Sequence, residues 1–364
     1  MRSKKQRSQI LLTGAFIGIL LILLGAVYIT VVVWSSEKVI DANDRDQIII
    51  PEENQQEQKN EDLQQPQQSM QKKELVYVFL EASKEIIIIN AEHDRIQERI
   101  QLPEEPVAAF FHAVDSKIYI AHTKTYAISV FDLRTKKVVQ KIELQSRPSN
   151  LVMAKGLLYI LLPDKHQVLV IDPATEGIEK EINVNKEPQQ IFFAEKSNKI
   201  FVTSRRPESL TMINPDILAI VDVMNLDNPP FGININPTER YYYITDDVDN
   251  QLIIIPIKAV KQERMIPTEV KPHSIAFTPN DRIILVTNEG SNTISIISSL
   301  QEKVLKNIEV GIAPTDIVVT NDGKKVYVAN HKDRTVSVID IEKMKKIKDI
   351  TVGENPVKLF IISQ

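Results

Sequence analysis

The sequence predicts an all-β fold: a seven-bladed β-propeller with shared-blade closure, preceded by one N-terminal transmembrane helix. Three observations predict it. Prolines recur at a nearly constant interval, short apolar runs follow them at fixed distances, and the two ends of the repeat region complement each other. The chain of 364 residues is long enough for one large repetitive domain.

The prolines set the period of the repeat. Spacings of 42, 40, 42, 42, 42 and 42 residues separate Pro106, Pro148, Pro188, Pro230, Pro272, Pro314 and Pro356. In the unit that starts at Pro148 the later runs come two residues early, which predicts a shortened turn before its second strand.

Each repeat unit contains four short apolar runs. One run follows the proline, two pentads come next, such as VYVAN from Val326 and VSVID from Val336, and a run such as KKIKDITV from Lys345 closes the unit. Four strands in about 42 residues are typical of a propeller blade. Helical repeats are excluded because the runs are rich in Ile, Val and Tyr and never continue at helical spacing.

The ends of the repeat region determine the number of blades. The first set of strands begins with VYVFL at Val76 and has no preceding proline strand, whereas the last element, PVKLFIISQ from Pro356, is a first strand with nothing after it. We therefore predict that the C-terminal strand pairs with residues 76–80. This pairing gives seven blades and leaves no long unpaired edge at either end.

The best-formed units resemble a known family of repeats. VYVAN at Val326 and ILVTN at Ile284, each followed ten residues later by another apolar pentad, are similar to the YVTN-type β-propeller repeats of bacterial surface and periplasmic proteins and archaeal surface-layer proteins. The resemblance covers residues 75–364. It implies the propeller fold but little about activity, since one fold hosts many functions.

The N-terminus has the pattern of a membrane anchor. Residues 1–9 hold four basic residues and no acid, and residues 10–34 form an uncharged stretch of 25 residues. Such a helix is about 37 Å long, enough to cross a hydrocarbon core of about 30 Å. The positive-inside rule predicts a cytoplasmic basic tail, a single-pass cell-membrane protein and an extracytoplasmic propeller at residues 75–364.

Residues 35–74 are predicted to form a disordered, acidic, Gln-rich tether. Eight of the residues between Pro51 and Glu74 are Gln. A segment of this composition cannot bury enough apolar surface to offset its ordering entropy. We expect it to act as a spacer between the membrane and the propeller.

Composition excludes several functions. The chain has no Cys, which rules out disulfides, Cys-ligated metals and thiol nucleophiles, and its single Trp lies in the membrane span rather than in quinone-docking repeats. A net charge of −4 argues against nucleic-acid binding. No motif points to catalytic residues, a cofactor or a metal. The expected partner is an envelope protein or a surface polymer.

The repeat also predicts which polar residues are neighbours. The loop between the second and third strands of a blade and the link to the next blade share one rim, the usual ligand face of propellers. Besides the candidates named next, the links bring Asn150, Gln190, Ser274, Asp316, Asn355 and Lys358 to this rim. The candidate rim contacts for a ligand or partner are His122, Arg147, His166, Arg205, Arg206, Asp246, Asp247, Asp249, Lys271, His273 and His331.

Two functions are consistent with these residues. The favoured one is a binding or assembly module without catalysis. The alternative is a lactonase-like hydrolase that uses His122, His273 or His331 with a rim Arg. His122 occupies the slot of Asn288 and Asn330, so we expect it to cap a turn. The D-x-D sequence at Asp246–Asp249 lacks the Gly and distal Glu of a calcium loop, so turn capping is expected there too.

Overall fold

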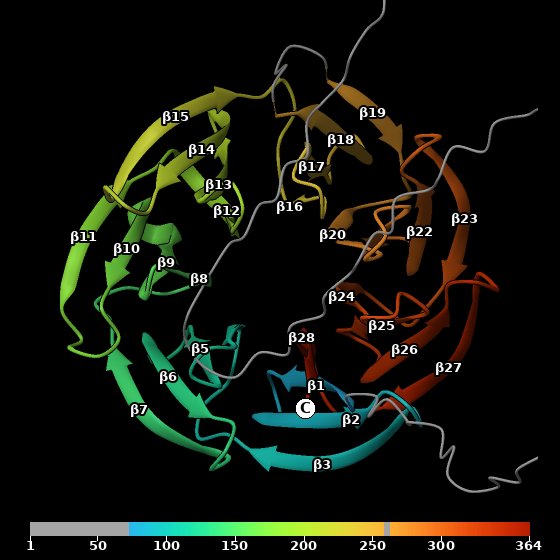
Figure 1. Cartoon of the computed structure of the whole chain (residues 1–364), viewed down its shortest axis with the longest axis horizontal. Helices are drawn as coiled ribbons and strands as arrows, with labels where there is room; N and C mark the ends of the chain where they lie inside the picture. Colours follow the sequence, from blue (N-terminus) through green and yellow to red (C-terminus); the bar gives the residue numbers. More distant parts are fainter. Residues whose placement is uncertain (1–72, 258–262) are drawn as a thin grey trace, which may run out of the picture. The chain divides into compact units, whose positions relative to one another are not determined.

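Seven four-stranded antiparallel sheets surround a central axis in the computed structural model, which describes residues 73–257 and 263–364 (Figure 1). The predicted all-β, seven-bladed propeller is confirmed. The predicted membrane helix at residues 10–34 lies outside the described residues, as do the basic tail and residues 35–72 of the predicted tether. The last two tether residues are ordered in the propeller: Lys73 bonds to Gln364, and Glu74 begins β1. Within the described part of the chain, no helix has the length and apolar character needed to cross a membrane.

The blades are numbered along the chain, and the innermost strand of each is named first. Blade 1 contains β28 (Pro356–Ser363), β1 (Glu74–Leu80), β2 (Glu85–Asn90) and β3 (Arg95–Gln101). Blade 2 contains β4 (Ala108–His112), β5 (Lys117–His122), β6 (Ala127–Asp132) and β7 (Lys137–Glu143). Blade 3 contains β8 (Asn150–Ala154), β9 (Leu157–Leu162), β10 (Gln167–Ile171) and β11 (Ile178–Asn183), with the short helix η1 (Pro163–Lys165) between β9 and β10.

The remaining four blades follow the same order. Blade 4 contains β12 (Lys186–Ala194), β13 (Lys199–Arg206), β14 (Glu208–Asn214) and β15 (Ala219–Asn225). Blade 5 contains β16 (Ile233–Ile235), β17 (Tyr241–Asp246), β18 (Gln251–Pro256) and β19 (Arg264–Pro267). Blade 6 contains β20 (Pro272–Phe277), β21 (Ile283–Asn288), β22 (Thr293–Ser298) and β23 (Lys303–Glu309). Blade 7 contains β24 (Pro314–Val319), β25 (Lys325–Asn330), β26 (Thr335–Asp340) and β27 (Lys345–Thr351).

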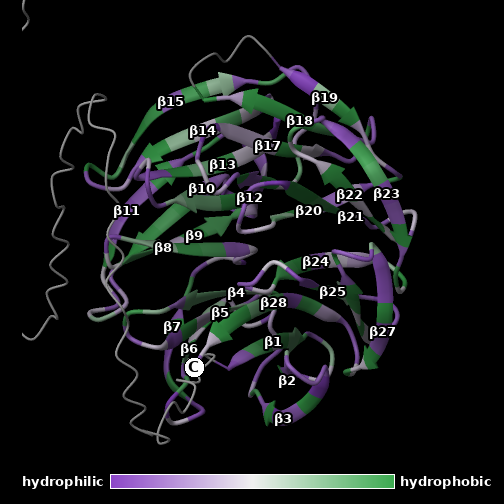
Figure 2. Cartoon of the chain, turned by 45° about the vertical axis from the view of Figure 1, so that its right-hand side comes forward, coloured by the Kyte–Doolittle hydropathy of each residue, from purple (hydrophilic) through white to green (hydrophobic). Residues whose placement is uncertain are grey.

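Hydrophobicity changes across each blade. The second and third strands are buried on both faces between neighbouring blades, which is why they are almost continuously apolar, as in the four isoleucines of β2. The outer strands face solvent and carry charged residues, as in RIQERIQ of β3. Figure 2 shows this difference as green middle strands and purple bands on outer strands such as β23 and β27.

The two ends of the chain close the ring in one sheet, as predicted. β28 pairs antiparallel with β1, with Leu75 opposite Ile362 and Val78 opposite Leu359. Side chains of blade 7 reinforce the seam with blade 1: the Lys325 ammonium lies 2.8 Å from the carboxylate of Asp94. The inner strands of successive blades contact one another all the way round, β28 against β4 included.

Blade 3 contains the predicted shortened turn. Only Lys155 and Gly156 connect β8 to β9, and both have positive φ angles, 52° and 79°. A two-residue hairpin with both central residues at positive φ matches the twist of its strands. The two-residue deletion of this unit therefore lies at the face opposite the predicted rim, and the segments that form the rim have their usual lengths.

Candidate functional site

The predicted rim forms through backbone hydrogen bonds between loops and links. The Glu289 amide donates to the Lys271 carbonyl (2.8 Å), and the His331 amide donates to the Ala313 carbonyl (2.9 Å). Each bond joins a loop between second and third strands to the link that enters the same blade. These bonds fix the side chains of both segments around the mouth of the channel.

A repeated polar slot lies at the end of the second strands. In blade 7, Asn330 Nδ2 donates to Thr335 Oγ1 (2.9 Å) and Ser337 Oγ (2.8 Å), and Asn288 makes the equivalent bonds in blade 6. His122 fills this slot in blade 2. Its Nε2 lies 2.8 Å from Ser129 Oγ, and its Nδ1 lies 2.9 Å from the carbonyl oxygen of Glu105.

His122 is therefore held in a structural position. Its side chain is buried, both ring nitrogens have protein partners, and burial lowers the pKa of the imidazole below its ordinary value of 6.5. The geometry agrees with a structural role, but the side-chain partners of His122 lie on the third strand and the entering link and not in the turn that it was expected to cap. An imidazole so enclosed is poorly placed to contact a ligand.

Most other candidate rim residues form separate local pairs. Asp246 caps its own turn by accepting from the amides of Val248 and Asp249, both at 3.0 Å, as expected. The same turn is tied to the preceding link, because Asn228 donates to Asp249 at 3.0 Å. The backbone of Lys271 donates to Asn250 Oδ1 (2.8 Å).

The rim arginines have acidic partners. Arg206 lies 3.0 Å from Glu187, and Arg147 lies 2.8 Å from Asp164. Arg205 pairs with Asp247 of the next blade and also lies over the ring of Phe231, 5.5 Å from its centroid. Because Arg205 is partly buried in these contacts, it holds two blades together in addition to contributing rim charge.

Of the candidate set, His273 and His331 line one cavity. Both line a mouth cavity of about 380 Å³, together with Glu289, Asp316 and Lys358. The His273 ring packs 4.5 Å from the Phe231 ring. Burial lowers the pKa of His273, against the opposing effect of the nearby Glu289 and Asp316 charges. His166 lies elsewhere, at the end of η1 with a left-handed φ of 56°.

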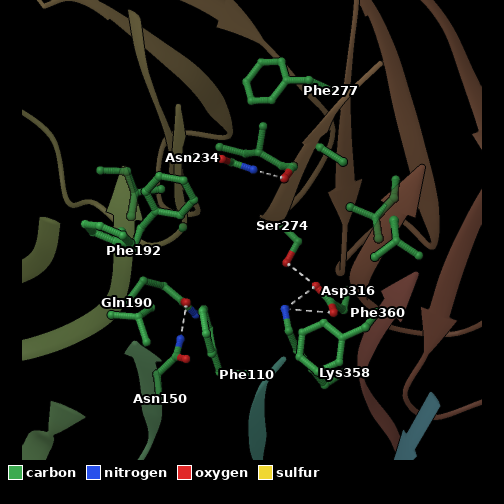
Figure 3. Close-up of a pocket in the computed structure, with 18 of the residues that line it drawn as sticks. Phe110, Asn150, Gln190, Phe192, Asn234, Ser274, Phe277, Asp316, Lys358 and Phe360 are labelled. Carbon is green, nitrogen blue, oxygen red and sulfur yellow. Dashed lines mark hydrogen bonds and ion pairs between the residues drawn. The ribbon is translucent and has the colours of Figure 1, made fainter. Parts of the chain in front are cut away.

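A ring of polar side chains lies just inside the mouth (Figure 3). Asn150 Nδ2 donates to Gln190 Oε1 (2.6 Å) across the boundary of blades 3 and 4. Each member lies two residues after a repeat proline, so the 42-residue period sets them at one level of the channel. The members of this polar ring are Asn150, Gln190, Ser274, Asp316 and Lys358.

Asp316 is the centre of the charged side of the polar ring. Its buried carboxylate accepts from the Leu359 amide (2.8 Å) and the Ser274 hydroxyl (3.4 Å) and lies 3.1 Å from the Lys358 ammonium. These contacts join blades 6, 7 and 1. The carboxylate is thus fixed and neutralised by its neighbours, which is the usual condition for a buried charge.

Phenylalanines line the same channel beyond the polar ring. Phe110, Phe192 and Phe360 each lie four residues after a repeat proline, and Phe277 lies five after one. Together with the polar ring they line a cavity of about 570 Å³ (Figure 3). We call these four residues the phenylalanine belt. The belt was not predicted from the sequence, although three of its four members recur at one repeat position, four residues after the proline.

No group of three or more metal-ligating side chains that could hold a metal ion occurs within residues 73–257 and 263–364. Asp316 and Glu289 both line the mouth cavity, but the Asp316 carboxylate already interacts with Leu359, Ser274 and Lys358.

Two family models match the chain. Residues 254–364 match that of a YNCE-like β-propeller, and residues 45–232 match that of a domain of unknown function, DUF5074. Neither model is named for the YVTN repeat, so that resemblance stays a prediction. No curated protein matches the sequence.

Solved structures share the fold at low sequence identity. A candidate 6-phosphogluconolactonase from Bacteroides fragilis has a TM-score of 0.70 and 13% identity, covering 82% of this chain and 100% of that one. A protein from Lactobacillus plantarum has a TM-score of 0.68 and 12% identity over 80% and 100%. Hydrazine synthase from Kuenenia stuttgartiensis has a TM-score of 0.64 and 14% identity over 71% and 90%. At these identities the likeness concerns the fold alone.

Proposed function

The chain belongs to the DUF5074 family, whose model matches residues 45–232, more than half of its 364 residues, and we propose that it is a membrane-anchored, extracytoplasmic binding module. Its partner is an envelope protein or surface polymer that docks on the rim. The observation that carries the proposal is the pairing of polar residues at the rim and in the channel. They pair with one another across blade boundaries, as in Arg205–Asp247 and Asp316–Lys358, and so form a rigid, preorganised surface.

The rim charges provide the test of docking. Arg206 and Lys271 are exposed, and rim charges act mainly on association rate and specificity. The double variant Arg206→Glu, Lys271→Glu should weaken capture of partners from envelope extract by the full-length chain about tenfold, and more at low salt than at high salt. The matched control is Lys324→Glu, an exposed change in the loop between β24 and β25 on the opposite face. Equal loss in the control would contradict docking on the rim.

The orientation has its own test. The basic residues at positions 2–7 precede the uncharged span, which supports an extracytoplasmic propeller. Protease added to intact protoplasts should cut the tether and release a folded fragment of about 290 residues. Cleavage that occurs only after lysis would show that the propeller faces the cytoplasm.

A lactonase-like hydrolase is the second candidate. It is favoured by one observation: His273, His331 and Glu289 line the same mouth cavity, so a base and an acid could reach one substrate. The likeness to candidate lactonases supports the fold only. Turnover of a lactone panel that is abolished by His273→Ala and by His331→Ala would establish this function and overturn the binding module.

A further inference from the structure

The channel changes chemistry along its length, from the polar ring near the mouth to the phenylalanine belt beyond it. Such a change suits a ligand with one polar end and one apolar end. The hydrogen-bonding capacity left in the polar ring determines what kind of polar end it can hold.

The polar ring has unused donors. Gln190 Oε1 accepts from Asn150, whereas no described residue accepts from Gln190 Nε2. The Lys358 ammonium carries three N–H groups; its described hydrogen-bond acceptor is the carboxylate of Asp316, and it also lies 5.7 Å from the centroid of the Phe360 ring. Asp316 in turn is occupied by Leu359, Ser274 and Lys358. A ligand head must therefore accept hydrogen bonds.

The charges at the mouth favour an uncharged head. Asp316 and Lys358 cancel each other, which leaves the Glu289 carboxylate as the remaining acidic charge among the described lining residues. An anionic head in this cavity would be repelled by the like charge of Glu289. A cationic ammonium head has no lone pair, so it cannot accept a hydrogen bond from Gln190 Nε2 or from the Lys358 ammonium. An ester, lactone or amide carbonyl accepts without adding charge.

The phenylalanine belt provides the apolar part of the site. Phe110, Phe192 and Phe360 come from blades 2, 4 and 1, and their rings face one cavity from different sides (Figure 3). The cavity of about 570 Å³ is of the size that holds small-molecule ligands. Removing an alkyl chain from water onto these rings is favourable in proportion to its apolar area.

We propose that the central channel binds an amphipathic small molecule whose uncharged carbonyl head contacts Gln190 and Lys358 and whose apolar tail lies in the phenylalanine belt. This inference rests on the proposed binding function. It adds a ligand class and a second binding surface, separate from the rim charges that dock the partner.

Three probes of similar tail and different head test the ligand class. γ-Decalactone is uncharged, heptanoate is anionic and hexyltrimethylammonium is cationic, and each carries a hexyl chain. The readout is the midpoint of thermal unfolding of the full-length chain in lipid nanodiscs, followed by circular dichroism. At about ten times its dissociation constant, the lactone should raise the midpoint by about 3 °C, and the two charged probes should raise it by much less.

Channel variants and a matched control locate the site. Gln190→Met and Phe192→Ala should abolish the lactone shift, each measured against its own ligand-free midpoint. Gln189→Met should keep the lactone shift. The side-chain amide of Gln189 donates to the Glu187 carbonyl (2.9 Å), and Gln189 does not line the cavity. If Phe192→Ala fails to fold, Gln190→Met still decides the outcome.

The possible results separate the two proposals. A lactone shift that is absent, that survives in both channel variants, or that is matched by a charged probe overturns the ligand class. Lactone consumption is measured in the same samples by chromatography. Hydrolysis by wild type that Gln190→Met removes would keep the ligand class and overturn the non-catalytic function instead.

Discussion

At the scale of single residues, one slot recurs at the end of the second strands and is filled by different residue types around the ring. Asn288 and Asn330 use the amide to reach a Ser seven residues later, and His122 reaches Ser129 through Nε2 at the same spacing. Asp246 instead caps its turn through backbone amides. In blades 2, 6 and 7 the polar side chain in this slot therefore ties the second strand to the third, whereas blades 1 and 3 have Leu80 and Leu162 there.

The slot makes the fold sensitive to pH. Burial lowers the pKa of His122 in the folded protein, so between the folded and unfolded pKa values the unfolded chain binds more protons. Stability is full above about pH 6.5 and falls as pH drops through the folded pKa. His122→Asn should keep the fold and flatten the decline between pH 8 and pH 5, measured by urea unfolding. His273, whose pKa is also lowered, accounts for the part that remains. An unchanged slope in the variant would contradict this role.

At the scale of elements, the outer strands show how the propeller protects its edges. Charged residues on an edge strand oppose pairing with other chains. Strands β3, β7, β11, β23 and β27 carry at least three charged residues each, whereas β15 carries only Asp222 among seven. Ile220, Val221 and Val223 of β15 are exposed. The edge of blade 4 is the least protected of the long outer strands.

A charge on β15 should therefore reduce aggregation. Val223→Lys is expected to raise the temperature at which the protein aggregates by several degrees, measured by light scattering. The free energy of unfolding should change by less than about 0.5 kcal/mol, since the side chain is exposed. Val139→Lys on β7 is the control, because this exposed position lies on a strand that is already charged. An equal gain from the control would point to net charge rather than to the β15 edge.

The repeat predicted the strands well because each strand must occupy the same place in its blade. It was least informative in blade 5, where β16 has only three residues. Pro229 and Pro230 lack amide donors, and Phe231 and Gly232 both bond to Thr245 of β17, with the Gly232 amide donating to the Thr245 hydroxyl instead of to a backbone carbonyl, which interrupts the regular ladder before β16. The site was predicted only in part. The rim neighbours followed from the period, whereas pairing such as Asp316 with Lys358 depends on how adjacent blades meet.

At the scale of the whole molecule, closure depends on nine residues at one end. Leu359 and Ile362 of β28 are buried, and β28 also pairs along the length of β1. Burial of each such side chain contributes about 1.5–3 kcal/mol. Deletion of residues 356–364 should therefore destabilise the full-length chain by several kcal/mol, seen as a lower midpoint in thermal unfolding. Removal of Gln364 alone should cost about 1 kcal/mol. A midpoint within a degree or two of wild type after the longer deletion would contradict the shared blade.

The shared blade also sets a waiting time during synthesis. β1 is the first strand of the propeller to be made, and its partner β28 is made after all the other strands, when most of the 284 residues that follow Leu80 have been added. At about 5–20 residues per second, this takes about 15–60 s. Throughout that interval the inner edge of β1 has no strand to pair with, and an open edge of apolar sequence is a template for misassembly. The nascent chain must therefore be shielded or kept from collapsing until its final strand arrives, so the yield of folded protein depends on elongation rate as well as on stability.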